Sequence, residues 1–243
     1  MPSDAFDVLI LVARPAAGKS ELIDYLKNKV SPAERLRRFH LRELDELDDF
    51  PMLWTWFEED RLLADMGLPR LHTDADGYFS RLEYWHLLMR RISLEYDKRR
   101  RDPAYHGRRS TLVEFSRGTE HGGYRAAFDH LSDALLGRAA VLYLQVSYAE
   151  SLRKNRKRFN PDKPDSILEH GLPDEKLERL YKKIDWDEFS AADPGFLSVR
   201  GRKLPYAVMP NEDDLTSERG EALGRRLEES LVRLWSLRGA AGR

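Results

Sequence analysis

The sequence predicts an α/β protein, a three-layer α/β/α arrangement around a five-stranded, mostly parallel sheet. Five short apolar runs, of the kind that form buried strands, alternate with segments whose apolar residues recur at helical spacing. The first of these runs passes through a short turn directly into a helical segment. Strands that alternate with helices pair in parallel and are buried between two helix layers, so a single α/β domain is the expected unit.

The first three strands are expected at residues 7–13, 38–42 and 110–115. The first is apolar and rich in β-branched side chains, and the third repeats that pattern. The second is less apolar and runs into an acidic stretch. Ser31, which precedes a proline, predicts a capped helix start before it, and residues 76–101 predict a long helix.

The fourth and fifth strands are expected at residues 139–146 and 203–209. Pro205 favours an edge position for the fifth strand, because proline donates no hydrogen bond to a neighbouring strand. Residues 185–203 before it look irregular. The last helix, with Thr216 as a candidate cap, carries a stripe of leucines that we assign to the core: Leu223, Leu227, Leu231 and Leu234.

Composition limits the classes of function. Lysine and arginine total 41 against 42 aspartate and glutamate, a balance that gives no overall attraction to nucleic acid or membrane. The absence of cysteine excludes disulfides and thiolate metal sites. No apolar stretch is long enough to span a bilayer, and residues 1–4 leave no room for a signal peptide. We therefore expect a cytoplasmic protein with one domain over residues 1–243, and its oligomeric state is left open.

Residues 13–20 read ARPAAGKS between the first strand and the first helix. There, glycine lets the backbone approach a phosphate, and successive amides at a helix N-terminus attract its oxygens. Lys19 is expected to reach the outer phosphates, and the Ser20 hydroxyl to bind Mg²⁺. The stretch resembles the Walker A motif of P-loop nucleotide-binding proteins, GxxxxGK[ST], with Ala13 in place of the first glycine. The residues expected to bind nucleotide are Ala13, Arg14, Pro15, Ala16, Ala17, Gly18, Lys19, Ser20 and Glu21.

Charged residues follow two other strands. Ligands of a parallel sheet bind at the carboxyl ends of its strands, so these residues are candidates for the site. Glu43 and Asp45 follow the second expected strand, and Glu114 ends the third. A carboxylate at that position suits Mg²⁺, so Glu114 is expected to join Ser20 at the metal. Arg117 carries a guanidinium that matches a phosphate bidentately.

Taken in order, these features resemble the P-loop kinases of nucleosides and nucleotides. The features are the phosphate loop, the acids after the second strand, Glu-x-Ser-Arg at 114–117, and an arginine-rich helix after the fourth strand. The segment SYAESLRKNRKRF at 147–159 is similar to the start of their lid, whose arginines close over ATP. The resemblance implies a lid over about 147–185, a helical acceptor-site insertion over about 43–109, and ATP and Mg²⁺ as cofactors. The lid candidates are Arg153, Arg156 and Arg158.

The stretch ELDELDDFPMLWTWF at 43–57 is similar to the deoxynucleoside kinases. In those enzymes an acid after the second strand is the base toward the substrate hydroxyl, and nearby aromatic side chains stack on the nucleobase. The likeness implies that Glu43 or Asp45 is the base here. It also implies an acceptor pocket lined by Trp54, Trp56 and Phe57.

The favoured hypothesis is a kinase that moves a phosphoryl group from ATP to an unidentified small molecule, such as a nucleoside or nucleotide. Its catalytic set is Lys19, Glu114, Arg117, Glu43, Asp45, Arg153 and Arg156. The first alternative is an NTPase or nucleotide switch with no small-molecule acceptor. The second is a kinase of RNA or DNA ends that binds through basic residues: Lys98, Arg99, Arg100, Arg101, Arg108 and Arg109.

Overall fold

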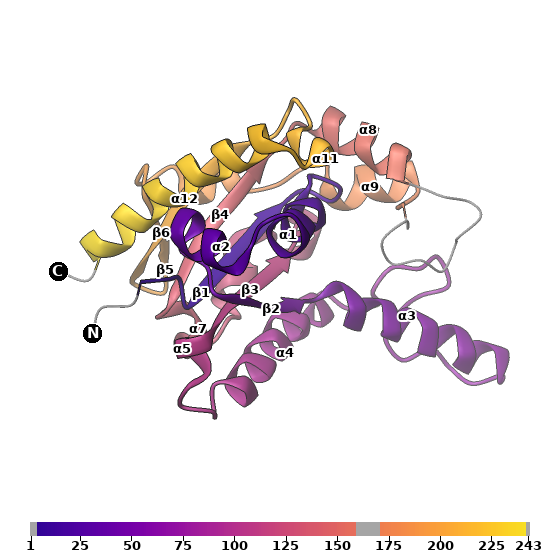
Figure 1. Ribbon diagram of the computed structural model, residues 1–243. Coiled ribbons are helices and arrows are strands. Elements are labelled where there is room, and N and C mark those ends of the chain that lie inside the picture. Colours follow the sequence, from indigo (N-terminus) through magenta and orange to yellow (C-terminus); the bar gives the residue numbers. More distant parts are fainter. Residues whose placement is uncertain (1–3, 159–170, 242–243) are drawn as a thin grey trace.

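The computed structural model describes residues 4–158 and 171–241 and contains a six-stranded sheet (Figure 1). The strand order is β2-β3-β1-β4-β6-β5, with every neighbouring pair parallel except the antiparallel pair β5 and β6. The strands are β1 (Val8–Ala13), β2 (Glu43–Asp48), β3 (Arg109–Phe115), β4 (Ala139–Gln145), β5 (Phe196–Val199) and β6 (Arg202–Pro210).

Helices cover both faces of the sheet, which confirms the predicted three-layer arrangement. Alternate residues of β1 enter opposite cores, Val8, Ile10 and Val12 on one face and Leu9 and Leu11 on the other. The first face is covered by α4 (Glu83–Arg99), α6 (Gly123–Asp129), α7 (Asp133–Leu136) and α10 (Trp186–Ser190). The second is covered by α1 (Lys19–Asn28), α2 (Pro32–Phe39) and α12 (Glu221–Ala241), as Figure 1 shows.

The remaining helical segments lie around the ends of the strands. They are α3 (Phe50–Asp65), α5 (Tyr105–Arg108), the 3₁₀ turn η1 (Thr119–His121), α8 (Tyr148–Arg158), α9 (Asp174–Tyr181) and α11 (Leu215–Glu218). None of the described helices is both long and apolar enough to cross a membrane.

The second strand was predicted at the wrong residues. Residues 38–42 contain the end of α2, and His40 closes that helix in the left-handed region with φ 53°. The acidic run is the strand instead, paired in parallel with β3 from Glu43 to Asp48. Its two leucines reach opposite cores, Leu44 the α1 side and Leu47 the α4 side. Four acidic residues are accommodated because β2 is an edge strand.

The predictions for the other edge of the sheet were also incomplete. The segment expected to be irregular contains β5, so the sheet has six strands and not five. Pro205 does not mark an edge, because β6 lies between β4 and β5. Pro205 is opposite Phe196 of β5, and the ladder to β4 begins one residue later at Tyr206. The missing amide of Pro205 therefore falls just before that ladder starts.

Two of the predicted helix features are confirmed. Ser31 caps α2, accepting a hydrogen bond from the Glu34 amide at 3.3 Å. The leucine stripe of α12 lies fully in the core. Thr216 does not cap α12, because it belongs to the separate helix α11. The long helix expected from residue 76 begins only at Glu83 as α4.

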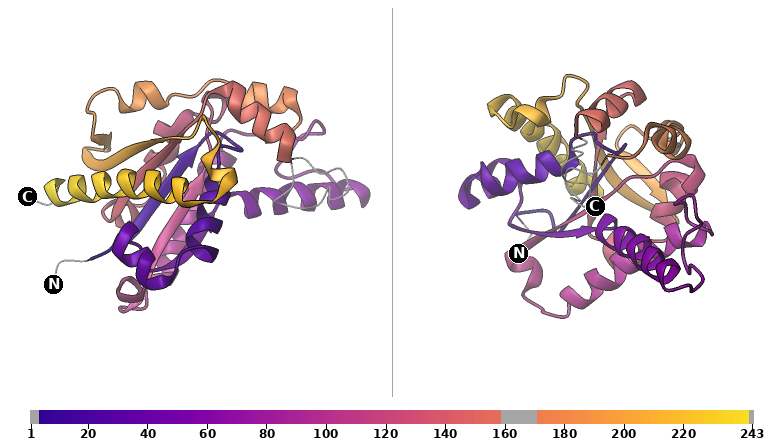
Figure 2. Two further views of the ribbon diagram at one scale, coloured as in Figure 1. Left: turned by 45° about the horizontal axis from the view of Figure 1, so that its top comes forward. Right: turned by 90° about the vertical axis from the view of Figure 1, so that its right-hand side faces the viewer.

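Helix α3 extends well beyond the edge of the sheet (Figure 2), and the chain after it folds back along it. Asp60, which is completely buried, anchors this return. Its carboxylate accepts hydrogen bonds from the amides of Leu71, His72 and Thr73 and from the Thr73 hydroxyl, at 2.5–2.9 Å. Burial alone would raise the pKa of Asp60, but these hydrogen bonds outweigh it and lower the pKa to about 2.

We expect Asp60→Asn to lower the free energy of unfolding at pH 7 by about 2 kcal/mol, since a shift of this size stabilises the fold by that order. The lowered folded-state pKa means that this stabilisation is present above about pH 4 and is lost as the pH falls toward 2. Urea unfolding at pH 7 and pH 3 measures it, and the difference between wild type and variant should shrink at pH 3. Asp65→Asn, an exposed position of the same helix, is the control. An equal loss in both variants would contradict the anchoring role.

Candidate active site

The 13–20 loop joins β1 to α1 and takes its shape from two left-handed residues. Gly18 has φ 108° and is the N-cap of α1, and Ala16 has φ 54°. Ala13, where the Walker A motif has glycine, is the last residue of β1, is fully buried and has no positive φ. A Cβ is therefore accommodated at Ala13, while the left-handed conformation falls at Gly18.

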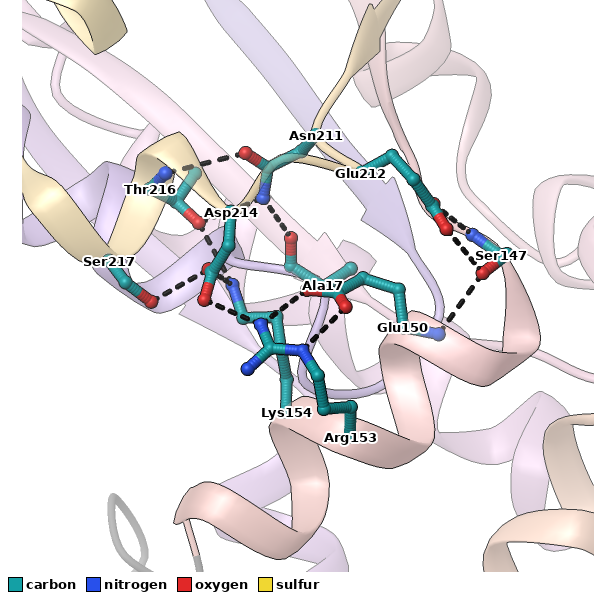
Figure 3. Close-up of polar contacts among 10 residues, drawn as sticks. All are labelled: Ala17, Ser147, Glu150, Arg153, Lys154, Asn211, Glu212, Asp214, Thr216 and Ser217. Carbon is teal, nitrogen blue, oxygen red and sulfur yellow. Dashed lines mark hydrogen bonds and ion pairs between the residues drawn. The ribbon is translucent and has the colours of Figure 1, made fainter.

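The back of the 13–20 loop packs against the chain that follows β6 (Figure 3). A Cβ on Gly18 would lie 2.2 Å from Thr216 Oγ1, so only glycine leaves room for this threonine. The side-chain amide of Asn211 donates to the Ala17 carbonyl and to Thr216 Oγ1, both at 2.8 Å. The Ser151 hydroxyl of α8 donates to the Pro15 carbonyl at 2.7 Å. The loop is thus held from two sides by residues distant in the sequence.

An ion-pair network continues from Thr216 into α8 (Figure 3). The buried Lys154 ammonium donates to Thr216 Oγ1 at 3.0 Å and contacts the Asp214 carboxylate at 2.6 Å. Arg153 lies between two carboxylates, Glu150 at 2.7 Å and Asp214 at 2.8 Å. These contacts lower the pKa of Asp214 to about 2 although burial opposes them.

The predicted lid arginines therefore differ in position. Arg153 is held by Glu150 and Asp214, and Arg156 by Asp174 at 2.6 Å, and neither lines the central cavity described next. Arg158 does line it, together with Asn155. The predicted lid also includes residues 159–170, which lie outside the described residues.

A cavity of about 380 Å³ opens at the carboxyl ends of β1, β2 and β3. Its wall brings together four residues of the predicted site: Lys19, Ser20, Glu114 and Arg117. Lys19 Nζ donates to Ser116 Oγ at 2.9 Å. Of the other residues predicted to bind nucleotide, Pro15 and Ala16 line the cavity, while Arg14 bonds the carbonyls of Tyr181 and, at 3.1 Å, Lys182. Glu21 lies in the first turn of α1.

Two half-buried carboxyl groups lie on one side of this cavity. Asp48 ends β2 directly opposite Glu114 in the β2–β3 ladder. Burial, with repulsion from Glu114 and Asp49, raises the pKa of Asp48 to about 9. Burial also raises the pKa of Glu114, although the Lys19 ammonium favours its ionised form. The ionised form of Asp48 is therefore disfavoured beside Glu114.

Arg117 is buried beneath the same cavity. Its guanidinium contacts the Asp49 carboxylate at 2.6 Å and donates to the Ser116 carbonyl at 2.7 Å. It lies 5.1 Å from the centre of the Trp85 ring and 5.5 Å from that of Phe115. Only 1 % of Arg117 is exposed, so its charge is matched by a protein carboxylate and its position is fixed.

Glu43 and Asp45, expected at the carboxyl end of the second strand, lie at the opposite end of the sheet. They occupy the first half of β2, beside the start of β3, and border a separate pocket. Asp45 accepts hydrogen bonds from Arg99 at 2.7 Å and from the Tyr105 hydroxyl at 2.6 Å. Glu43 pairs with Arg109 at 3.2 Å. The structure does not bring either acid to Lys19, because the strand begins five residues later than predicted.

Sequence reasoning missed Asp48 and Asp49, two of the acids that line the cavity. A correct register for β2 would have placed them there, since both stand at the end of the leucine-containing run. It also missed Asn211 and Thr216, for which no local pattern gives a signal. Of the predicted aromatic residues, Trp54 and Phe57 line an adjoining cavity, whereas Trp56 stacks on His72 with ring centres 4.8 Å apart.

Comparison with known proteins found no matching family model and no matching curated protein. Two solved structures align along nearly the whole chain. A gluconokinase from Sinorhizobium meliloti 1021 is 15% identical, with 95% of this chain and 94% of that chain covered and a TM-score of 0.46. A shikimate kinase from Acinetobacter baumannii, in complex with shikimate, is 15% identical, with 95% and 93% covered and a TM-score of 0.39. Neither likeness bears on the chemistry of the cavity, which its own residues define.

We expect Gly18→Ala to destabilise the protein by about 2–4 kcal/mol, because it combines a strained φ with a clash against Thr216. Gly67→Ala is a matched control, since Gly67 also has a positive φ but an added Cβ would meet no atom within 4 Å. The control should cost about 1 kcal/mol. Urea unfolding of both variants measures the difference, and equal losses would show that the contact with Thr216 does not hold the loop.

Proposed function

We propose that this protein is a kinase that transfers the γ-phosphoryl group of ATP, with Mg²⁺, to a hydroxyl group of a small molecule. The proposal rests on the residues that line one cavity. Its wall combines Lys19 and Ser20, which follow the left-handed Gly18, with the half-buried carboxyl pair of Asp48 and Glu114. Phosphoryl transfer needs these elements, which are donors for the phosphates, oxygen ligands for a cation and a polar group for the acceptor hydroxyl.

In this proposal the 13–20 loop and the N-terminus of α1 bind the phosphates. Gly18 caps α1, so the first amides of the helix, which have no partner within it, face the position of an anion. The Lys19 ammonium reaches Ser116 across the cavity and there meets the outer phosphates. Its charge offsets the charge that develops on the transferred group. Arg158, which lines the same wall, adds a second cation from α8.

The residues present fit a magnesium ion bound together with nucleotide. The described residues contain no group of three or more acidic or histidine side chains that would hold a metal by themselves. Mg²⁺ in nucleotide sites takes only one or two protein oxygens and completes its shell with phosphates and water. Ser20 and Glu114 supply two, and Glu114 Oε2 is buried without a hydrogen-bond partner among the described residues. Bound there, the ion would neutralise phosphate charge.

Asp48 is the residue we assign to the acceptor hydroxyl, in place of Glu43 or Asp45. It lines the same cavity as Lys19 and is half-buried, so few water molecules would compete for its hydrogen bond to an incoming hydroxyl. The Arg117–Asp49 pair forms the fixed floor beside it. Catalysis would then rest on positioning and electrostatics, with Asp48 orienting the hydroxyl toward the phosphoryl group.

The structure does not favour the alternative of a nucleic-acid end kinase, which requires a surface of unpaired basic side chains. Most of its basic residues are paired with carboxylates of the chain itself. Lys98 contacts Glu95, Arg99 contacts Asp45, Arg100 contacts Asp97, Arg108 contacts Asp102, and Arg109 contacts Glu43. Cations that are neutralised in this way offer little net charge to a phosphate backbone. Experiment distinguishes the kinase from the NTPase alternative, because ADP release by an NTPase switch does not depend on an acceptor.

We expect Lys19→Ala to raise the Kd for ATP at least tenfold, because a charge-assisted contact with the outer phosphates is lost. Isothermal titration with Mg·ATP measures the change. Lys203→Ala, at an exposed position of β6 away from the cavity, should bind ATP as wild type does. Unchanged affinity in Lys19→Ala would remove the basis for a nucleotide site in this loop.

We expect Asp48→Asn to lower kcat for phosphoryl transfer by roughly 10²–10⁴, with little change in the Kd for ATP, because it alters the group facing the acceptor hydroxyl. Asp45→Asn is the matched control from the same strand and should keep kcat once the folded fraction is taken into account. Acceptor-dependent ADP release measures both. A larger fall in kcat for Asp45→Asn would restore the assignment made from the sequence.

A further inference from the structure

A second cavity, of about 450 Å³, adjoins the first between α3, residues 77–82 and α9. The two cavities have wall residues in common: Phe50, Leu53, Trp85, Leu172 and Tyr181. A molecule with one end beside Asp48 in the first cavity can therefore extend into the second. The volume lies within the roughly 300–1,000 Å³ of cavities that hold drug-sized ligands.

Aromatic side chains dominate the wall of this second cavity. They are contributed by α3, by the turn before α4 and by α4 itself: Trp54, Phe57, Tyr78, Phe79 and Trp85. Several of them touch one another, with Phe57 and Phe79 ring centres 5.3 Å apart and Phe79 and Trp85 4.9 Å apart. Such a wall favours a flat apolar group through burial and ring stacking.

Several of the charged side chains that border this cavity contact other parts of the protein. Glu58 accepts a hydrogen bond from the Trp54 indole at 2.9 Å. Lys176 donates to the Gly77 carbonyl at 3.1 Å, and the Arg179 guanidinium lies 4.1 Å from the centre of the Tyr78 ring. Arg61 and Arg81 also border it and are exposed to solvent. The cavity therefore holds few buried polar groups with which to bind a hydroxyl-rich molecule.

One buried group in the wall does lack a partner. His121 is 1 % exposed, and its Nδ1 accepts a hydrogen bond from the Gly118 amide at 3.2 Å. Burial keeps the ring neutral by lowering its pKa, so the proton is on Nε2. Nε2 has no hydrogen-bond partner among the described residues. An unpaired buried donor costs free energy, and an acceptor atom on a bound molecule would remove that cost.

We propose that this aromatic cavity binds the body of the phosphoryl acceptor, and that the acceptor is an alcohol with a largely apolar ring body. The inference rests on the kinase function proposed above. A polyol or sugar acid would lose hydration without gaining partners along this wall. A nucleoside would find few fixed partners for the polar atoms of its base edge, since aromatic and aliphatic side chains make up much of the wall.

The test uses three compounds, 2-(1-naphthyl)ethanol, thymidine and gluconate, with the full chain. Binding is measured without ATP by isothermal titration, and phosphorylation is measured with Mg·ATP. Leu82→Glu places a carboxylate at an exposed position of the cavity wall and should weaken binding of the naphthyl alcohol at least about tenfold. Leu87→Glu, equally exposed on α4 but outside the cavity, should leave binding unchanged.

Saturable binding of the naphthyl alcohol that is weakened only by Leu82→Glu supports the cavity assignment, even if no compound is phosphorylated. In that case the binding site stands, and the kinase function is decided by the ATP-binding test of Lys19→Ala. Phosphorylation of gluconate or thymidine with no binding of the naphthyl alcohol overturns the inference and leaves the kinase function intact. Equal effects of the two leucine variants on binding also overturn it, because the cavity would then not be the site.

Discussion

The contact of Thr216 with Gly18 is the constraint on which the site depends. It joins the chain after β6 to the 13–20 loop, and the Asn211–Ala17 hydrogen bond spans 194 residues beside it. Because Thr216 also receives Lys154, the loop, α8 and α11 are fixed together. The direction of Lys19 and Ser20 into the cavity follows from that support, since a loop of small residues has few contacts of its own. Binding sites on loops gain precision when neighbouring elements hold them in this way.

The carboxyl pair of Asp48 and Glu114 is the second feature that packing alone does not explain. Parallel register pairs the two at the strand ends, where both side chains are half-buried, so their ionised forms repel each other. A fold that needed only a stable sheet end would place apolar or paired side chains there. Strongly perturbed carboxyl groups facing a cavity are typical of functional sites. A cation and a hydroxyl are the two ligands that would relieve this repulsion.

The sequence was sufficient for features that depend on neighbouring residues. The strand, loop and helix around Lys19 were predictable because apolar periodicity and the glycine-lysine-serine pattern are local. Glu114 was placed correctly because β3 is clearly apolar. Asp48 was missed because β2 is an edge strand with four acids, and its strand character comes from pairing with β3 and not from its own composition. Asn211 and Thr216 could not be predicted, since their partners lie almost two hundred residues away.

Trp85 connects the polar and apolar halves of the site. The Arg117 guanidinium lies 5.1 Å from the centre of the Trp85 ring. The His121 ring stacks on Trp85, with ring centres 3.7 Å apart. The Trp85 ring borders both cavities. It lies against Arg117, which pairs with Asp49, and it forms part of the wall proposed to bind the apolar body of the acceptor. A ligand stacked on this wall would therefore press on the same side chain that supports the Arg117–Asp49 pair. Trp85 is thus one of the five residues that the two cavities share, and its ring also lies against the guanidinium that pairs with Asp49.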